Sequence, residues 1–204
     1  MCGRFTIDVD LAEIIKVFKL DNIPAYYRPQ ENIAPSQKVP VVLQKDSKRN
    51  LNDFRWGLIP SWTKEQSNSA KLFNARAETV AAKPSFRRPF LYQRCLVPAT
   101  GFYEWQTIGK QKIPYLFSAT GKKLIAFAGI WDSWLSPTAE EIFSFSIITT
   151  VANDQMQPYH DRMPVILAQP EEQEKWLLNQ PTASLLSLLK PYEGQLDITQ
   201  VAKL

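Results

Sequence analysis

The second residue of the chain is a cysteine, which places two nucleophiles on one residue. Removal of Met1 is favoured by a small side chain at position 2 and would give Cys2 a free α-amine. The reference pKa of an α-amine, about 7.7 to 8.0, leaves part of it unprotonated at neutral pH. The reference pKa of a cysteine thiol is about 8.5. Cys2 therefore predicts a nucleophile for an aldehyde.

The expected product of that attack is cyclic. The amine adds to the aldehyde to give a carbinolamine and then an imine, and the thiol closes on the same carbon to form a five-membered thiazolidine. This closure is fast because both groups belong to one residue. Taken by itself, Cys2 is equally compatible with an accidental cysteine at a frayed terminus.

Two short segments add side chains suited to the same chemistry. Strand alternation over residues 72–78 places Asn74 and Arg76 on one face, where the amide can form hydrogen bonds and the guanidinium can bind a phosphate. Glu104 lies in the aromatic run 102–105, and desolvation there would raise its pKa toward a role in proton transfer. Pairing of Glu104 with an arginine is the alternative.

His160 is the single histidine and lies between two prolines in the irregular segment 158–164. Its reference pKa of about 6.5 makes it the first candidate for proton transfer at neutral pH. A histidine in a loop can also be an ordinary surface residue.

Residues 56–62 bring aromatic side chains near basic ones, a combination used for stacking on single strands. Burial is expected for at least one of the tryptophans in this segment, and residues 86–90 are read as either a phosphate-facing patch or a solvated turn.

The composition excludes several classes of protein. The 24 Lys and Arg against 20 Asp and Glu give a net charge of +4, which permits a polyanionic partner without requiring one. The sequence has no phosphate-binding glycine loop, and two cysteines and one histidine are too few for most zinc sites. With no signal peptide and no apolar run of about 18 residues, we expect a cytoplasmic protein without a membrane partner. The proposed chemistry requires no metal and no cofactor.

The pattern of short apolar runs predicts an α+β fold. Asp10 and Glu13 resemble a capping box before an amphipathic helix with Leu11, Ile14 and Phe18 on one face. Helices are also predicted at 170–178 and 182–190. We expect a single domain over residues 1–204, with a mostly antiparallel, barrel-like β core and flanking helices. The predicted strands are 39–43, 54–59, 94–105, 113–117, 124–130, 142–151 and 164–167.

Six motifs in order resemble the SRAP family, the SOS-response-associated peptidases. They are MCGRF (1–5), WGLIP (56–60), NARAE (74–78), VPATGFYEW (97–105), FAGIW (127–131) and HDRMP (160–164). The resemblance implies the SRAP fold and recognition of abasic sites in single-stranded DNA during the DNA damage (SOS) response, with a stable covalent DNA-protein cross-link through the N-terminal cysteine. It also implies association with the nucleoid when the protein is bound to DNA. We expect a monomer.

The resemblance also implies roles for individual residues. The nucleophile is Cys2, Asn74 positions the terminus and the opened sugar, Glu104 handles protons during imine formation, and His160 stabilises the sugar hydroxyl. The expected DNA contacts are Arg4, Arg76, Arg162, Trp62, Pro40 and Thr149.

Two other functions stay open at the level of sequence. An N-terminal nucleophile can use its own amine as a base, so a peptidase with Cys2 and His160, whose minimal activity is removal of Met1, is one of them. A non-covalent binder of single strands is the other. A weak lyase activity through the imine is expected beside the cross-link.

Overall fold

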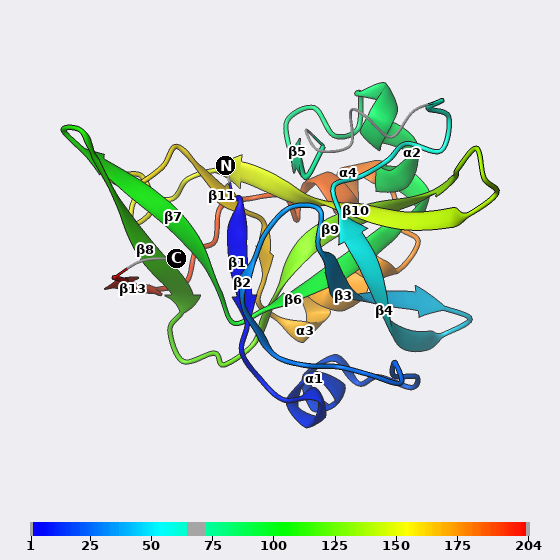
Figure 1. Cartoon of the computed structure of the whole chain (residues 1–204), viewed down its shortest axis with the longest axis horizontal. Helices are drawn as coiled ribbons and strands as arrows, with labels where there is room; N and C mark the ends of the chain where they lie inside the picture. The colour runs from blue at the N-terminus through cyan, green and yellow to red at the C-terminus, as the bar shows by residue number, and fades with distance from the viewer. Residues whose placement is uncertain (1, 65–71, 203–204) are drawn as a thin grey trace.

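In the computed structural model, which describes residues 2–64 and 72–202, five strands close into a ring at the centre of the molecule (Figure 1). Neighbours around the ring pair antiparallel, except that β10 runs parallel to β4. The predicted mostly antiparallel, barrel-like core is confirmed. The ring strands are β3 (Lys38–Lys45), β4 (Lys48–Trp56), β6 (Arg94–Ala99), β9 (Ile125–Leu135) and β10 (Glu141–Val151).

Aromatic side chains fill the interior next to this ring. The Phe5 ring packs edge-on against Trp56 and Phe127, with centroids 5.0 and 5.8 Å away, and Trp56 stacks on Phe145. All four side chains are fully buried. Since burial of each aromatic ring stabilises the fold by roughly 1.5–3 kcal/mol, this cluster ties β1, which carries Phe5, to the ring.

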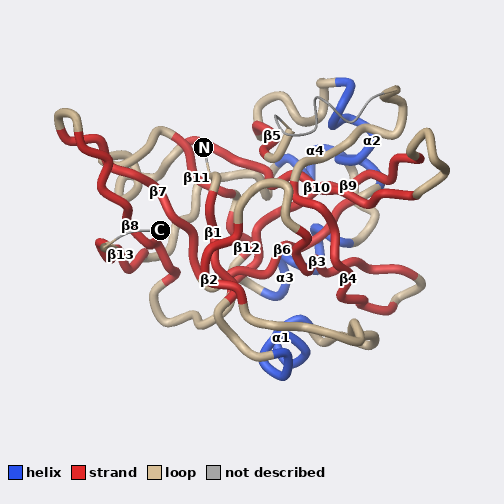
Figure 2. The backbone as a smooth tube through the Cα atoms, in the orientation of Figure 1, coloured by secondary structure: helices blue, strands red, loops and turns tan. Residues whose placement is uncertain are grey.

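A second sheet carries the amino-terminal strand. Its order is β13 (Leu196–Gln200), β8 (Gln111–Ala119), β7 (Gly101–Ile108), β1 (Arg4–Ile7) and β2 (Gln30–Ile33), as the tube in Figure 2 shows. Arg4 of β1 pairs with Tyr103 of β7. This register brings Cys2, just before β1, to the part of β7 that carries Glu104.

Three short strands extend the barrel sheet: β5 (Asn74–Arg76), β11 (Arg162–Pro164) and β12 (Ile166–Leu167). β5 runs parallel to β10, and β11 runs antiparallel to it. Thr149 of β10 is opposite Arg76 on one side and Pro164 on the other. Motifs that lie far apart in the sequence therefore meet at the end of β10.

Helices flank the β core. Helix α1 (Leu11–Phe18) begins as predicted, because the Asp10 side chain accepts a hydrogen bond from the Glu13 amide at 2.9 Å. The others are α2 (Pro84–Tyr92), α3 (Pro170–Leu177) and α4 (Thr182–Leu186). Helix α4 ends four residues before the predicted end. No helix among residues 2–64 and 72–202 is both long and apolar enough to cross a bilayer.

The prediction of one continuous strand over 94–105 is wrong. The chain bends at Thr100, so that β6 stays in the ring and β7 enters the second sheet. At Gly101 a Cβ atom would lie 2.7 Å from the Phe117 carbonyl oxygen, so the crossing requires glycine. The predicted strand 54–59 is shifted, since β4 ends at Trp56 and Gly57 has a φ of 126°. Residues 86–90, read as a patch or a turn, lie inside α2.

Close packing in the ring predicts a specific coupling between Gly129 and Cys95. A Cβ atom at Gly129 would lie 2.6 Å from the Cys95 sulfur and 3.0 Å from a Val97 methyl group. We expect Gly129→Ala to lower the free energy of unfolding by about 1–3 kcal/mol through overpacking. In the double variant Cys95→Ala/Gly129→Ala the missing sulfur makes room, so urea denaturation should give a loss smaller than the sum of the single losses. Additive losses would contradict this packing.

Candidate active site

Cys2 is held inside the protein by a residue 72 positions away. Its carbonyl oxygen accepts a hydrogen bond of 2.8 Å from the Asn74 side-chain amide, and its sulfur is 3.8 Å from the Arg4 carbonyl oxygen. The Cys2 residue is completely buried. In the described part of the chain the Asn74 side-chain oxygen is buried and accepts no hydrogen bond. The hydrogen bond from Asn74 therefore ties the amino-terminal segment to β5.

The environment of Cys2 disfavours its thiolate. Burial raises the pKa of the Cys2 thiol far above its ordinary value, and the negative charge of Glu104 raises it further. The antiparallel pairing of Arg4 with Tyr103 places Cys2 next to the part of β7 that carries Glu104. The sulfur is consequently a neutral thiol at neutral pH.

Glu104 is poised for proton transfer. It is 3% exposed on β7, and burial raises the pKa of its carboxyl to about 7. The negative charge of Asp161 adds to this rise in pKa. A group that titrates near neutral pH can both donate and accept a proton during one reaction. The burial of Glu104 thus agrees with the desolvation that the sequence predicts.

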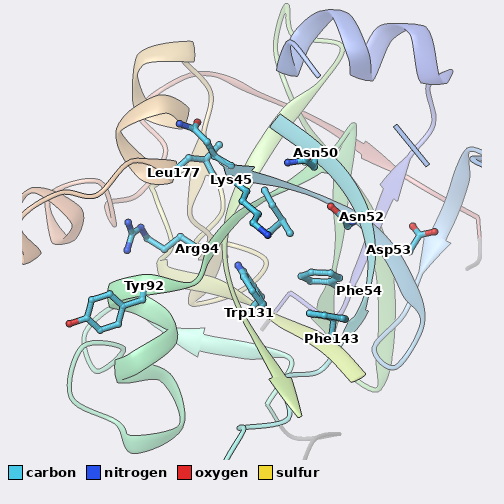
Figure 3. A pocket seen from close by; sticks show the side chains of 12 residues that line it. Lys45, Asn50, Asn52, Asp53, Phe54, Tyr92, Arg94, Trp131, Phe143 and Leu177 are labelled. Atoms are coloured by element: carbon cyan, nitrogen blue, oxygen red, sulfur yellow. The ribbon is translucent and has the colours of Figure 1, made fainter. Parts of the chain in front are cut away.

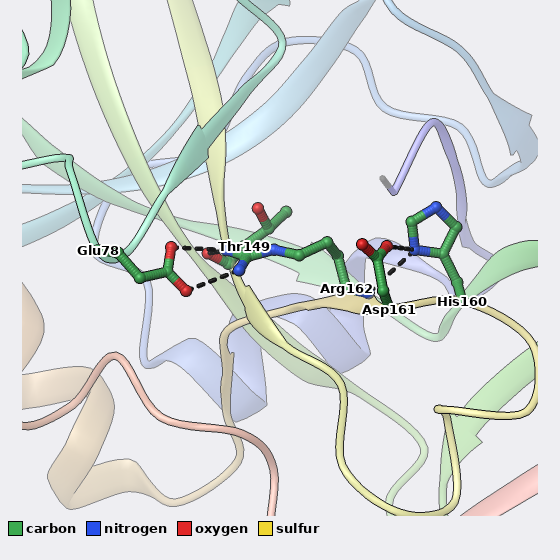
Figure 4. Close-up of polar contacts among 5 residues, drawn as sticks. All are labelled: Glu78, Thr149, His160, Asp161 and Arg162. Carbon is green, nitrogen blue, oxygen red and sulfur yellow. Dashed lines mark hydrogen bonds and ion pairs between the residues drawn. The ribbon is translucent and has the colours of Figure 1, made fainter.

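His160 lies just before β11, and one hydrogen bond fixes its protonation pattern (Figure 4). Its Nδ1 accepts from the Arg162 backbone amide at 2.9 Å, although the Asp161 carboxylate lies 2.8 Å from the same nitrogen. The contact with the amide requires an unprotonated Nδ1, whereas the contact with the carboxylate requires a protonated Nδ1. The amide belongs to the first residue of β11, whose side chain is bound by Glu78 and Thr149, whereas the Asp161 side chain is 85% exposed and can turn to water. Burial also lowers the pKa of His160, so the ring is neutral with its proton on Nε2.

The Arg162 side chain is bound within the protein. Its two terminal nitrogens donate to the Glu78 carboxylate at 2.6 and 3.0 Å, and one of them also donates to the Thr149 carbonyl oxygen at 2.6 Å. Arg162 is 8% exposed. A phosphate contact by Arg162 stays a prediction. The sequence interpretation missed Glu78 as a partner, although Glu78 falls on the same strand alternation as Asn74 and Arg76.

The other expected DNA contacts fall into two groups. Arg76 is exposed next to Asn74, Thr149 is buried between Arg76 and Arg162, and Arg4 is half-buried beside Cys2. Trp62 lies apart from them and is 66% exposed, while Trp56 of the same segment is buried as expected. Pro40 is buried in β3 and faces a hollow that contains none of the four candidate catalytic residues.

The loop that carries Trp62 is anchored at its base. The buried Asp132 carboxylate accepts a hydrogen bond from the Ser61 amide at 2.9 Å, and the Trp134 indole donates to the Thr63 carbonyl oxygen at 2.7 Å. Sequence interpretation missed Asp132, because a single carboxylate within a strand carries no signal of its partner.

A large hollow lies elsewhere on the protein. It has a volume of about 600 Å³ and is lined by the rings of Phe54, Trp131 and Phe143, with Lys45 pointing in from above (Figure 3). None of Cys2, Asn74, Glu104 and His160 lines it. Within residues 2–64 and 72–202 no group of three or more metal-ligating side chains occurs. The candidate site residues Cys2, Glu104 and Asn74 are instead buried or partly buried polar groups.

The buried Cys2 near the amino terminus, the buried Glu104 and His160 are carried by the strands, or the segments beside them, of a barrel-like β core. The whole chain, residues 1–204, matches the family model described as SOS response associated peptidase (SRAP). The protein therefore belongs to the SRAP family.

Similar proteins support this assignment along the full length. The abasic site processing protein YoqW of Bacillus subtilis is 41% identical over 210 residues, which cover 100% of this chain and 93% of YoqW. The abasic site processing protein HMCES of Gallus gallus is 36% identical over 82% of this chain and 60% of its own. A crystal structure of a protein from Bacteroides thetaiotaomicron matches with a TM-score of 0.91 and 32% identity over 98% of this chain and 92% of that chain.

The raised pKa of Glu104 predicts a pH-dependent cost to stability. Because the pKa of Glu104 is higher in the folded protein, the native state holds the Glu104 proton more tightly than the unfolded state does. The stabilisation that this proton provides is lost as the pH rises from about 4.5 through about 7. Glu104→Gln should therefore gain stability relative to wild type between pH 5 and pH 8.5, by up to about 3 kcal/mol in urea denaturation. The matched control Glu140→Gln alters an exposed carboxylate and should show no such gain. Equal pH profiles for Glu104→Gln and wild type would refute the raised pKa.

Proposed function

We propose that this protein captures abasic sites in single-stranded DNA as a covalent adduct through Cys2, after Met1 has been removed. The observation that carries the proposal is the hydrogen bond from Asn74 to the Cys2 carbonyl oxygen, which holds the terminal residue beside the buried Glu104. The proteins named as abasic site processing proteins, similar to this chain at 36–41% identity, give the substrate class.

The chemistry balances with the groups present. The α-amine of Cys2 attacks the aldehyde carbon of the opened sugar. The carbinolamine loses its hydroxyl as water when Glu104 donates a proton, and the nitrogen proton of the resulting iminium returns to the Glu104 carboxylate. The thiol then adds to the imine carbon, and its proton goes to the nitrogen. Since the pKa of Glu104 is about 7, the carboxyl can donate the first proton and be reprotonated at neutral pH.

Capture by sulfur has a protective consequence. An imine at the sugar carbon acidifies the neighbouring C2′ proton, which promotes β-elimination and cuts the strand. Ring closure removes the imine and so keeps the strand intact. We infer that the protein shields abasic sites during replication-associated damage and that strand cleavage is a weak side reaction. Neutral His160, with its proton on Nε2, is suited to donate a hydrogen bond to the sugar hydroxyl.

Several surface residues support a single strand as the partner. The exposed Arg76 lies next to Asn74, and the exposed Trp62 offers a ring for stacking on a base. The net charge of +4 favours a polyanion. We propose Arg4, Arg76 and Arg162 as phosphate contacts, with Trp62, Pro40 and Thr149 shaping the path of the strand.

A peptidase is the second candidate, and the family description includes that activity. The raised pKa of the Cys2 thiol argues against it, because a cysteine protease attacks as a thiolate. Removal of Met1 by the protein itself is the one peptide cleavage for which the position of Cys2 is suited.

A denaturing gel tests the proposal. Wild-type protein incubated with a single strand that bears one abasic site should give a shifted band that survives high salt. Cys2→Ala should lose the stable adduct, while borohydride can still trap an imine through the remaining α-amine. The matched control Cys95→Ala alters the other buried cysteine and should keep the adduct.

Two outcomes would contradict the proposal. A complex that disappears as salt rises would identify a non-covalent binder, because counterion release weakens phosphate contacts. An equally stable adduct with Cys2→Ala would exclude the thiazolidine. Protein that retains Met1 should form no adduct, since its Cys2 nitrogen lies in a peptide bond.

A further inference from the structure

We propose that Glu78 is a positioning residue for His160 and acts through Arg162, so that the neutral imidazole presents its Nε2 proton to the substrate. The proposal deepens the function proposed above and rests on it for the role of His160. It joins three contacts into one chain that runs from the NARAE segment to the HDRMP segment.

The first link is the ion pair of Glu78 and Arg162. Both carboxylate oxygens accept from the two terminal nitrogens of Arg162, at 2.6 and 3.0 Å (Figure 4). A bidentate pair fixes the plane of the guanidinium as well as its distance. The hydrogen bonds from Arg162 lower the pKa of Glu78, so the carboxylate stays charged at neutral pH.

The second link fastens this pair to the barrel. The Thr149 carbonyl oxygen accepts from Arg162 at 2.6 Å and from the Ala77 amide at 2.9 Å. The segment that carries Glu78 and the strand that carries Arg162 are thus held by one oxygen of β10. Loss of the Glu78 carboxylate would leave the buried Arg162 with a single acceptor and loosen β11 at its first residue.

The third link passes from Arg162 to the imidazole. The backbone amide of Arg162 donates to His160 Nδ1, which keeps that nitrogen unprotonated. The Asp161 carboxylate stands 2.8 Å from the same nitrogen and would prefer it protonated. If Arg162 moves, Asp161 takes over Nδ1, and the proton leaves Nε2. Glu78 therefore determines whether the Arg162 amide or the Asp161 carboxylate binds His160 Nδ1.

The charges around His160 give the sign of the pH effect. In the wild type, burial, the positive amino terminus and Arg162 lower the pKa of His160, while Asp161 raises it. When Asp161 pairs with Nδ1, the protonated imidazole is favoured and the pKa rises. Glu104, which also responds to the charge of Asp161, is a further ionisable group of the site, beside the Cys2 thiol.

The single histidine makes the test direct, because a long-range ¹H–¹⁵N spectrum contains one imidazole. We expect the wild type to show the Nε2-H tautomer. Glu78→Gln should shift the ring toward the Nδ1-H tautomer and raise the His160 pKa, and Glu78→Asp should restore both at least in part. The control Glu193→Gln removes an exposed ion pair with Lys190 and should change neither.

Cross-linking supplies the second measurement. Glu78→Gln should slow adduct formation about tenfold, in line with partial loss of one proton-transfer partner, while its affinity for an undamaged single strand stays within about twofold. An unchanged tautomer and pKa in a folded Glu78→Gln variant would overturn the proposal. Tighter strand binding with an unchanged tautomer would instead identify Glu78 as a competitor of the DNA phosphate.

The spectra and the gel separate the two proposals. If Glu78→Gln shifts the tautomer but the wild-type protein forms no adduct, the covalent function is refuted and the role of Glu78 is kept. If Glu78→Gln does not fold, Arg162→Lys carries the spectroscopic test and should give the same shift of the tautomer, since it keeps the positive charge but cannot form the bidentate pair with Glu78.

Discussion

The site depends on the hydrogen bond between the Asn74 amide and the Cys2 carbonyl oxygen. Chain termini fray unless they are tied down, and a nucleophile on a frayed end would have no fixed relation to an acid or a base. Here the pairing of β1 with β7 brings Cys2 to Glu104, and the parallel pairing of β5 with β10 brings Asn74 to Cys2. The two sheets of the fold thus meet at the amino terminus.

Burial then sets the protonation states that the proposed chemistry uses. It raises the pKa of the Cys2 thiol and of Glu104 and lowers that of His160, so that the thiol and the imidazole are neutral at neutral pH and Glu104 is partly protonated. Desolvation disfavours charge in each case. A site of this kind can exchange protons without first separating charges in a poorly solvated space.

Much of the fold was predictable, because it rests on local patterns. The Asp10 cap and the spacing of Leu11, Ile14 and Phe18 predict α1, and β alternation predicts most of the ring. The break at Thr100 was not predictable, since the apolar run continues through it and only the distant Phe117 requires Gly101. The motifs pointed to Asn74, Glu104 and His160. The pairing of Glu78 with Arg162 depends on which strands meet at β10, a choice that no local pattern encodes.

Intact-mass spectrometry of the reacted protein, followed by peptide mapping, tests the central claim most directly. We predict a chain without Met1 whose adduct has the summed mass of protein and strand minus one water, with the modification on Cys2. We also predict that the adduct survives without borohydride. An adduct mapped to a lysine, or a stable adduct on a chain that retains Met1, would contradict the central claim.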